Sequence, residues 1–368
     1  MLIRRCILFL LFLLLPVSCG GADQNIQAVL EDTIAKHDIP AIVAITLKGD
    51  KVAESGVAGV RVRDGNAPAT LNDYWHLGSC TKAMTASMAA RLVEQGTIDW
   101  DSTISKVLPD MVDGMHPAYR EVTLTQLLTH RGGLPKDMLG TEEWERAWSR
   151  TGSSHEQQLG FVKDVLAMKP IGPVGDYVYS NQGYAIAGYM CEVAAGETYE
   201  NLMQREVFGP LGMDSVGWGA PLTRGAEQPN GHKDDGKPSR PHGDNPIAIS
   251  AAGRVHCTMA DWAKFVASHL DQGKRQDPLL EPTTFNKLHS PANGPGNSYA
   301  LGWSVAKRNW GGGKVLTHAG SNTMFYCVVW IAPERNFAVL VACNQGGDIA
   351  SKACDEVAST CITRALRR

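Results

Sequence analysis

The chain has 368 residues, with a hydrophobic fraction of 43% and a charged fraction of 20%. This is the composition of a globular protein that can bury a core in one large or two modest domains. Its formal net charge at pH 7 is −3, and it contains no basic run or basic–aromatic stripe, which argues against a nucleic-acid partner.

The first 18 residues are predicted to be a signal peptide. Arg4 and Arg5 form a basic start, and the apolar run 7–15 is too short to span a bilayer. Cys19 stands where a bacterial lipoprotein carries its acylated cysteine, but Pro16 replaces the usual Leu. We therefore expect an exported protein, periplasmic or extracellular, and leave open whether Cys19 carries a lipid anchor.

The N-terminal part of the remaining chain predicts a helix followed by a hairpin. Apolar residues recur at helical spacing over 25–37, and two strand-like segments follow at 41–47 and 52–60. Gly49 and Asp50 supply the turn between them.

The middle of the chain predicts mainly helices. The strongest covers 80–95, where Gly96 provides a stop signal, and helical patterns broken by Gly/Pro loops continue to about residue 285. The polar, Pro- and Gly-rich stretch 225–244 is expected to be a long surface loop.

The last third predicts strands at 314–317, 324–331 and 337–343 and a closing helix over 349–366. Since both chain ends carry strands, we predict an α/β fold with an antiparallel sheet flanked by N- and C-terminal helices. The sheet domain would comprise residues 22–78 and 286–368, and residues 79–285 would form a large, mainly helical inserted domain.

Three short motifs could carry chemistry. In the first, Ser79-Cys80-Thr81-Lys82, a helical conformation would put an amine one turn from a hydroxyl that needs activation. Backbone N–H groups near the helix start would favour developing negative charge. On its own, the pattern also fits a helix cap and a solvated lysine.

The second motif is Tyr179-Ser180-Asn181. Tyr179 could act as a general base only if its pKa fell far toward neutrality, and a nearby Lys82 ammonium would lower it. Asn181 could donate to and accept from a substrate. The alternative is a tyrosine-rich turn that enters a helix.

The third motif is His318-Ala319-Gly320, followed by Ser321, between two predicted strands. Gly320 would let a substrate backbone lie close to the strand. The backbone N–H groups of Ser79 and Ser321 could form an oxyanion hole. The alternative is an inter-strand loop with a partly buried histidine.

Together, in this order and at separations of about 100 and about 140 residues, the motifs resemble those of the serine β-lactamase and penicillin-binding protein superfamily. The similarity is greatest to the branch of class C β-lactamases, D-alanyl-D-alanine carboxypeptidases and esterases. Supporting segments extend it over most of residues 25–365; they are 127–135, 210–213, 252–253 with Thr258 and Asp261, and 299–303.

The resemblance implies an acyl-enzyme mechanism on a small-molecule or peptide substrate, without a cofactor. Ser79 would be acylated, and Lys82 and Tyr179 would handle the proton, with the identity of the base left open. Asn181 and His318 would line the substrate site, and the amides of Ser79 and Ser321 would hold the oxyanion.

Two positions depart from the β-lactamase pattern. The third motif begins with His318 rather than Lys, and Ala319 stands where Thr or Ser is usual. Histidine is only partly charged near neutral pH and alanine offers no side-chain hydrogen bond. The departures weaken the antibiotic-hydrolysing interpretation and leave ester, amide or peptide substrates open.

Other functions have weaker support. An α/β-hydrolase would need a G-x-S-x-G elbow, and the stretch 296–300 only approaches it without a leading strand. A metal site is a minor alternative for the polar loop, which contains His232, Asp234, Asp235, His242 and Asp244. A catalytically idle protein that binds peptidoglycan or peptides is the remaining alternative.

Seven cysteines follow Cys19, with wide spacings and no CxxC pair. Zinc ribbons are therefore not expected. An odd number leaves at least one thiol unpaired within the chain, and we expect buried thiols rather than a disulfide framework.

Overall fold

The structure, a computed structural model, describes residues 25–136, 138, 140–292 and 298–367. The predicted signal peptide and Cys19 lie outside this range. Among the described residues, no helix combines the length and the apolar character needed to cross a bilayer.

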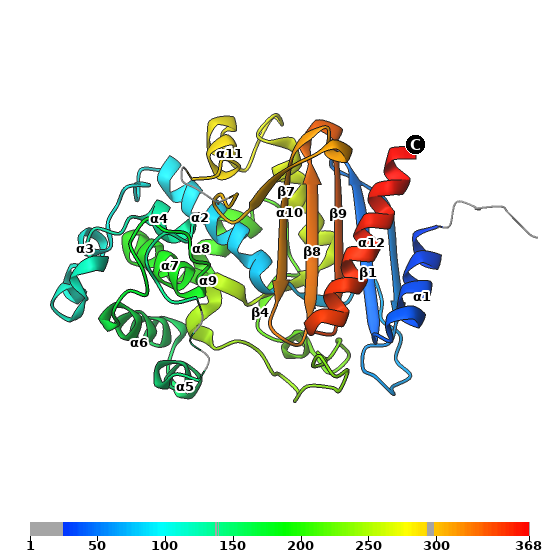
Figure 1. Cartoon of the computed structure of the whole chain (residues 1–368), viewed down its shortest axis with the longest axis horizontal. Helices are drawn as coiled ribbons and strands as arrows, with labels where there is room; N and C mark the ends of the chain where they lie inside the picture. Colours follow the sequence, from blue (N-terminus) through cyan, green and yellow to red (C-terminus); the bar gives the residue numbers. More distant parts are fainter. Residues whose placement is uncertain (1–24, 137, 139, 293–297, 368) are drawn as a thin grey trace, which may run out of the picture.

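A six-stranded antiparallel sheet forms the right-hand part of the molecule in Figure 1, in the order β2-β1-β9-β8-β7-β6. Both chain ends contribute to it, as the sequence predicts, and β1 pairs with β9 so that Ile42 lies opposite Cys343. The strands are β1 (Ala41–Lys48), β2 (Lys51–Gly59), β6 (Ser304–Arg308), β7 (Gly313–Ser321), β8 (Tyr326–Ala332) and β9 (Phe337–Cys343).

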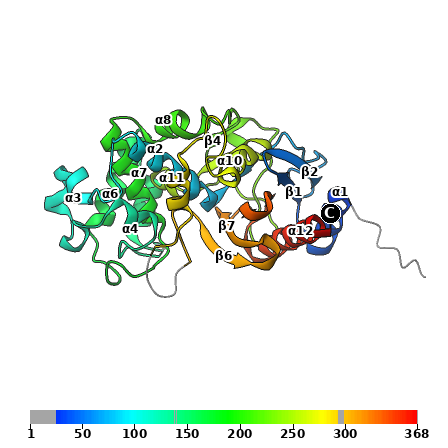
Figure 2. The same ribbon diagram turned by 90° about the horizontal axis from the view of Figure 1, so that it is seen from above.

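Helices cover both faces of this sheet. On one face α1 (Ile26–His37) and α12 (Gly347–Arg367) pack side by side, and on the other lies α10 (Met259–Asp271), as Figure 2 shows. Side chains on β9 alternate between two hydrophobic clusters: Leu340 belongs to the larger one, toward α10, and Val341 to the smaller one, toward α1 and α12. The period-2 pattern of a strand buried on both faces explains this division.

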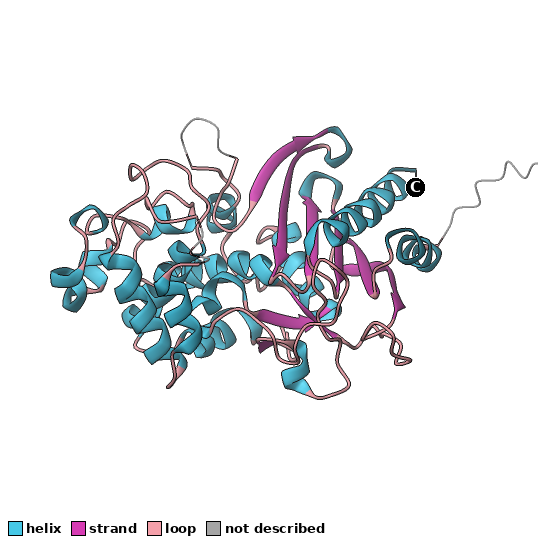
Figure 3. Ribbon diagram, turned by 60° about the horizontal axis from the view of Figure 1, so that its bottom comes forward, coloured by secondary structure: helices cyan, strands magenta, loops and turns pink. Residues whose placement is uncertain are grey.

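The remaining helices form a body beside the sheet, visible as the helix-rich half of Figure 3. The central helix α2 (Thr81–Glu94) is buried along almost its whole length. Around it lie α3 (Ile104–Val107), α4 (Leu124–Leu128), α5 (Glu142–Ser149), α6 (Ser154–Ala167), α7 (Asn181–Ala195), α8 (Tyr199–Met203), α9 (Ser250–Gly253) and α11 (Pro282–Leu288).

Two strand features differ from the sequence prediction. The sheet gains an edge strand, β6, and a separate three-stranded sheet forms from β3 (Tyr74–His76), β5 (Val255–Thr258) and β4 (Gly217–Trp218). Helix α10, from the segment predicted as the inserted domain, packs on the large sheet. The domain boundaries themselves stay a prediction.

The stretch 225–244 is a loop, as predicted, and about half of it is exposed, but parts of it are buried, which the prediction of a surface loop did not include. The side chains of His232 and Asp244 are buried at 0% and 6% exposure. His232 bonds to the backbone of Arg63 and Asn344, and Asp244 binds Arg254. Buried polar groups of this kind need such partners, so the loop packs into the protein at these points.

The seven cysteines after Cys19 are all buried free thiols. Cys80 and Cys327 approach each other, with their Sγ atoms 3.6 Å apart. These cysteines behave as small apolar core residues, as the sequence predicts.

Candidate active site

Ser79 lies in a tight 3₁₀ turn, Gly78–Cys80, that leads directly into α2. The turn is pressed against strand β7. A Cβ atom on Gly78 would lie 2.3 Å from the Ser321 nitrogen, and a Cβ on Gly320 would lie 2.0 Å from the Leu77 carbonyl oxygen. Only residues without a side chain allow this approach. It brings the backbone of Ser321 against the turn that carries Ser79.

Gly320 has no side chain, and the turn that carries Ser79 occupies the space where a Cβ atom of residue 320 would lie on one side of β7. Ala319, the neighbouring residue, is exposed, whereas His318 is buried.

Lys82 is fully buried, and its ammonium nitrogen lies among three neutral oxygen atoms. The distances from Nζ are 3.0 Å to Ser79 Oγ, 2.7 Å to Asn181 Oδ1 and 2.8 Å to the Ala252 carbonyl oxygen. Burial lowers the pKa of Lys82 to about 7, because a low-dielectric site disfavours the charged form. A large share of the molecules therefore carries a neutral amine here at neutral pH.

A neutral amine fits this arrangement closely. It has two N–H donors, which can bond to Asn181 and Ala252, and one lone pair, which can accept the Ser79 hydroxyl proton. The geometry is that of a base hydrogen-bonded to a nucleophile.

Tyr179 and Asn181 come from the segment that enters α7, where the Ser180 side chain caps the helix by accepting from Gly183 N. The Tyr179 ring lies beside Lys82, with its centroid 4.9 Å from Nζ. Burial raises the pKa of Tyr179, although a hydrogen bond with Ser79 acts in the opposite direction. The lowered pKa that Tyr179 would need to act as a general base is therefore not found, because burial dominates.

The Tyr179 ring packs in an aromatic cluster with His130 and Tyr299. The rings of His130 and Tyr179 lie 4.2 Å apart, and those of His130 and Tyr299 lie 4.5 Å apart. His130 Nδ1 accepts a hydrogen bond from Ser180 N at 3.0 Å, and burial lowers the pKa of this histidine. A neutral His130 therefore fixes both the backbone and the ring of the second motif.

His318 joins the same cluster. Its Nε2 lies 2.9 Å from Tyr299 Oη and its Nδ1 lies 2.6 Å from the Ala319 carbonyl oxygen. Both ring nitrogens therefore contact protein groups, and the side chain is only 7% exposed. Its role as a lining residue of the substrate site stays a prediction.

The structure brings together Ser79, Lys82, Asn181 and the Ser321 backbone, with Tyr179 beside them. Sequence reasoning did not assign roles to the Ala252 carbonyl, His130 or Tyr299. All three lie in segments that carry the family resemblance, so the sequence did mark these segments. Their contacts join residues far apart in the chain, and no short motif encodes such contacts.

The metal alternative gains no support from the described residues. Among them, no three His, Cys, Asp or Glu side chains gather as a metal site would require. In the polar loop, His232 and Asp244 have separate protein partners.

Comparison with curated proteins finds distant relatives that match most of this chain. An unguisins hydrolase, ungD', of Aspergillus campestris is 25% identical over 88% of this chain. The protein flp of Staphylococcus aureus is 21% identical over 90% of it. The chain spans 61% and 65% of the lengths of these relatives.

Solved structures share the fold at low sequence identity. A class C β-lactamase from Rhodobacter sphaeroides gives a TM-score of 0.73 at 20% identity, covering 92% of this chain and 98% of the other. The D-alanine carboxypeptidase AmpC from Burkholderia cenocepacia gives 0.71 at 19% identity, covering 91% and 97%. An octameric penicillin-binding protein homologue from Pyrococcus abyssi gives 0.72 at 23%, covering 89% and 75%.

The family model named Beta-lactamase matches residues 23–358, which is nearly the whole described chain. The chain therefore belongs to the Beta-lactamase family.

Proposed function

We propose that this protein is an exported hydrolase that forms an acyl-enzyme on Ser79, with Lys82 as general base, and that it cleaves an ester or amide. One observation carries the proposal: the buried Lys82 amine lies 3.0 Å from Ser79 Oγ, and burial lowers its pKa to about 7. A base poised near neutral pH is the most effective at neutral pH.

In the proposed acylation step, the neutral Lys82 amine accepts the Ser79 proton as Oγ attacks the substrate carbonyl. The carbonyl π electrons move to oxygen, and the amides of Ser79 and Ser321 stabilise the resulting oxyanion. Since its pKa is raised, Tyr179 remains a neutral phenol that can donate a hydrogen bond. As the oxyanion collapses, the bond between the carbonyl carbon and the leaving group breaks, and Tyr179 passes its proton to the leaving group and regains one from Lys82.

Water then attacks the acyl-enzyme carbonyl, and its proton passes to the same amine. The bond between Oγ and the carbonyl carbon then breaks, Ser79 Oγ takes the proton back from Lys82, and the acid product departs. Asn181 Oδ1 holds Lys82 through both steps, at the 2.7 Å contact described above.

Esters are favoured over β-lactams as substrates. Ala319 offers no hydroxyl, and His318 is buried against Tyr299, so neither supplies the fixed cation and hydroxyl expected to grip a β-lactam carboxylate. An amide or D-amino-acid peptide remains the second candidate within the same mechanism.

A substrate panel tests the proposal. Nitrocefin, p-nitrophenyl esters of varied chain length and a D-alanyl-D-alanine peptide are assayed with the wild type and Ser79→Ala. We expect ester turnover that Ser79→Ala abolishes and negligible nitrocefin turnover. Rapid nitrocefin hydrolysis would reverse the substrate assignment.

A catalytically idle binding protein is the competing function. It predicts that neither a fluorophosphonate nor a penicillin probe modifies Ser79. Covalent labelling of the wild type, absent in Ser79→Ala, excludes this alternative.

A further inference from the structure

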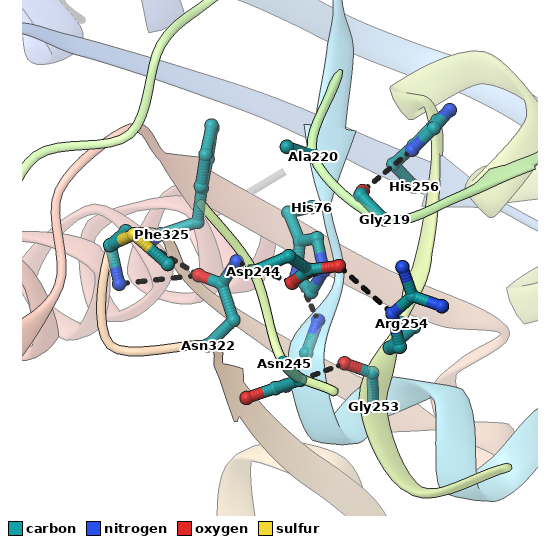
Figure 4. Close-up of polar contacts among 12 residues, drawn as sticks. His76, Gly219, Ala220, Asp244, Asn245, Gly253, Arg254, His256, Asn322 and Phe325 are labelled. Carbon is teal, nitrogen blue, oxygen red and sulfur yellow. Dashed lines mark hydrogen bonds and ion pairs between the residues drawn. The ribbon is translucent and has the colours of Figure 1, made fainter. Parts of the chain in front are cut away.

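Asp244 is a buried carboxylate that no part of the proposed chemistry uses. It lies in the loop before α9, is 6% exposed, and contacts three side chains from three different segments. Figure 4 shows it between His76, Arg254 and Asn322. Each of these residues is one to three positions away from a residue of the candidate site.

His76 connects Asp244 to the turn that carries Ser79. Its Nδ1 accepts a hydrogen bond from Gly78 N at 3.0 Å, so the ring proton belongs on Nε2. That nitrogen lies 2.8 Å from Asp244 Oδ1. The carboxylate thereby fixes the ring that holds the backbone immediately before the nucleophile.

Arg254 connects Asp244 to the carbonyl that contacts Lys82. Its Nε lies 3.2 Å from Asp244 Oδ2, and it follows Ala252 and Gly253 directly. The next loop residue adds a second link, because Asn245 Nδ2 donates to the Gly253 carbonyl at 2.8 Å. Gly253 packs on Gly78, where an added Cβ would lie 3.3 Å from the carbonyl carbon.

Asn322 connects Asp244 to the oxyanion segment. Its Nδ2 donates to Asp244 Oδ1 at 2.9 Å, and its Oδ1 accepts from the Phe325 nitrogen at 2.9 Å. Asn322 directly follows Ser321, whose amide is assigned to the oxyanion hole. Its side chain therefore ties the end of β7 to the same carboxylate.

We propose that Asp244 is a positioning residue that holds three parts of the active site together: the nucleophile turn, the Ala252 carbonyl beside Lys82, and the Ser321 amide. The inference rests on the function proposed above. A carboxylate suits this role because its two oxygens can accept from several donors at once. An amide would turn an N–H₂ group toward one of these donors.

Two aspartate variants provide the test. Asp244→Asn keeps the size of the side chain but removes the charge and acceptor capacity. Asp73→Asn is the matched control, because Asp73 is also buried and bonded to an arginine, Arg61, but its partners do not reach the site. Ester turnover is measured per active serine, counted by titration with a fluorophosphonate, and thermal stability is recorded for both variants.

We expect both variants to lose thermal stability, but only Asp244→Asn to lose turnover per active serine, by about 10- to 100-fold, mainly in kcat. A purely structural role would reduce the number of titratable serines and leave turnover per serine unchanged. That result would overturn the proposal.

Backbone amide exchange provides a second readout that does not depend on activity. Asp244→Asn should increase exchange in peptides that cover 76–80, 250–254 and 320–325, whereas Asp73→Asn should not. If the wild type were never labelled at Ser79, the proposed function would fail. The exchange pattern would still decide whether Asp244 holds the three segments, and an unchanged pattern would refute it.

Discussion

Lys82 illustrates how burial alone can prepare a base. Its contacts described above are neutral oxygens, so no carboxylate restores the charged form, and its pKa falls to about 7. The ammonium form cannot accept a proton from Ser79. We therefore expect the rate of Ser79 labelling by a fluorophosphonate to rise with pH, with a midpoint near 7.

The measurement is a second-order labelling rate constant from pH 5 to pH 9, below the range where the probe hydrolyses rapidly. Lys82→Met should label very slowly and without this midpoint. A wild-type rate that stays flat across this range would show that Lys82 is not the base.

The same pKa shift predicts how stability depends on pH. The folded-state pKa lies below the unfolded value of about 10.4, so the unfolded chain binds more protons between pH 7 and pH 10. The free energy of unfolding should therefore rise with pH across this window. Below pH 7 the buried Lys82 is charged in the folded state, and its full destabilising effect is present. The shift corresponds to about 5 kcal/mol.

Urea unfolding of the wild type and Lys82→Met at pH 6 and pH 10 checks this prediction. The free energy of unfolding of the variant minus that of the wild type should be larger at pH 6 than at pH 10, by a few kcal/mol. The variant also loses the hydrogen bonds to Asn181 and Ala252. Their contribution to stability is subtracted out when the values at the two pH values are compared. An equal difference at both pH values would contradict a depressed pKa.

Tyr179→Phe separates the two candidate bases. The variant keeps the ring beside His130 but removes the hydroxyl, so we expect labelling or ester turnover to fall by about 10²-fold. Because Lys82 remains the base, the pH midpoint near 7 should persist. If the variant showed no pH midpoint near 7, Tyr179 rather than Lys82 would be assigned as the base.

At the scale of elements, the site depends on how closely the turn before α2 approaches β7. Gly78→Ala would place a Cβ 2.3 Å from the Ser321 nitrogen, and Gly78 has a φ of +46°. Gly96→Ala is the control: Gly96 has a φ of +71° but nothing within 4 Å of the added atom.

Both variants incur the cost of a left-handed alanine, about 1 kcal/mol, which urea unfolding should show for Gly96→Ala. Gly78→Ala should destabilise the fold further and reduce Ser79 labelling per folded molecule by more than about 10-fold. If both variants labelled at the wild-type rate, the close approach would have no role in positioning Ser79.

Elements with a strong local pattern were predictable from the sequence. The hairpin of β1 and β2, strands β8 and β9, and helices α1, α2 and α12 all appear within a few residues of their predicted bounds. Strand β6 was missed because it is a half-exposed edge with two cationic residues, Lys307 and Arg308. The sheet β3-β5-β4 was missed because strands of two to four residues have too little periodicity to detect.

The candidate site follows the same division. The S-x-x-K spacing predicted the contact of Ser79 with Lys82, because both lie on one helical turn. The burial of Asp244 could not be predicted, because its three partners lie 10 to 168 positions away in sequence and the surrounding composition is that of an exposed loop. Burial also decided the Tyr179 pKa, and the sequence alone contains no measure of burial.

At the scale of the whole molecule, the site forms where the sheet meets the helical body. The sheet contributes β7 with Ser321, and the helical body contributes α2 with Lys82 and the start of α7 with Asn181. The chain ends that build the sheet are joined through β1 and β9. The position of β7 therefore depends on both hydrophobic clusters, the larger one toward α10 and the smaller one toward α1 and α12.

This shared sheet predicts that both hydrophobic clusters unfold together. Val341 is fully buried in the smaller cluster, under α1 and α12, and Val341→Ala should cost about 2 kcal/mol. Because β9 carries both clusters, losing the smaller one exposes strands that the larger one needs. We expect the variant to lower the urea midpoint of both clusters equally.

Buried thiols report on each cluster separately. Pulsed alkylation across a urea series, read by mass spectrometry, follows Cys191 and Cys257 in the larger cluster and Cys354 and Cys361 in the smaller one. All four should become reactive at one urea concentration, lower in Val341→Ala than in the wild type, and Ser79 labelling should disappear at the same point. If Cys354 and Cys361 reacted first while Ser79 could still be labelled, the sheet would tolerate the loss of one covering layer, and β7 would be positioned by the larger cluster alone.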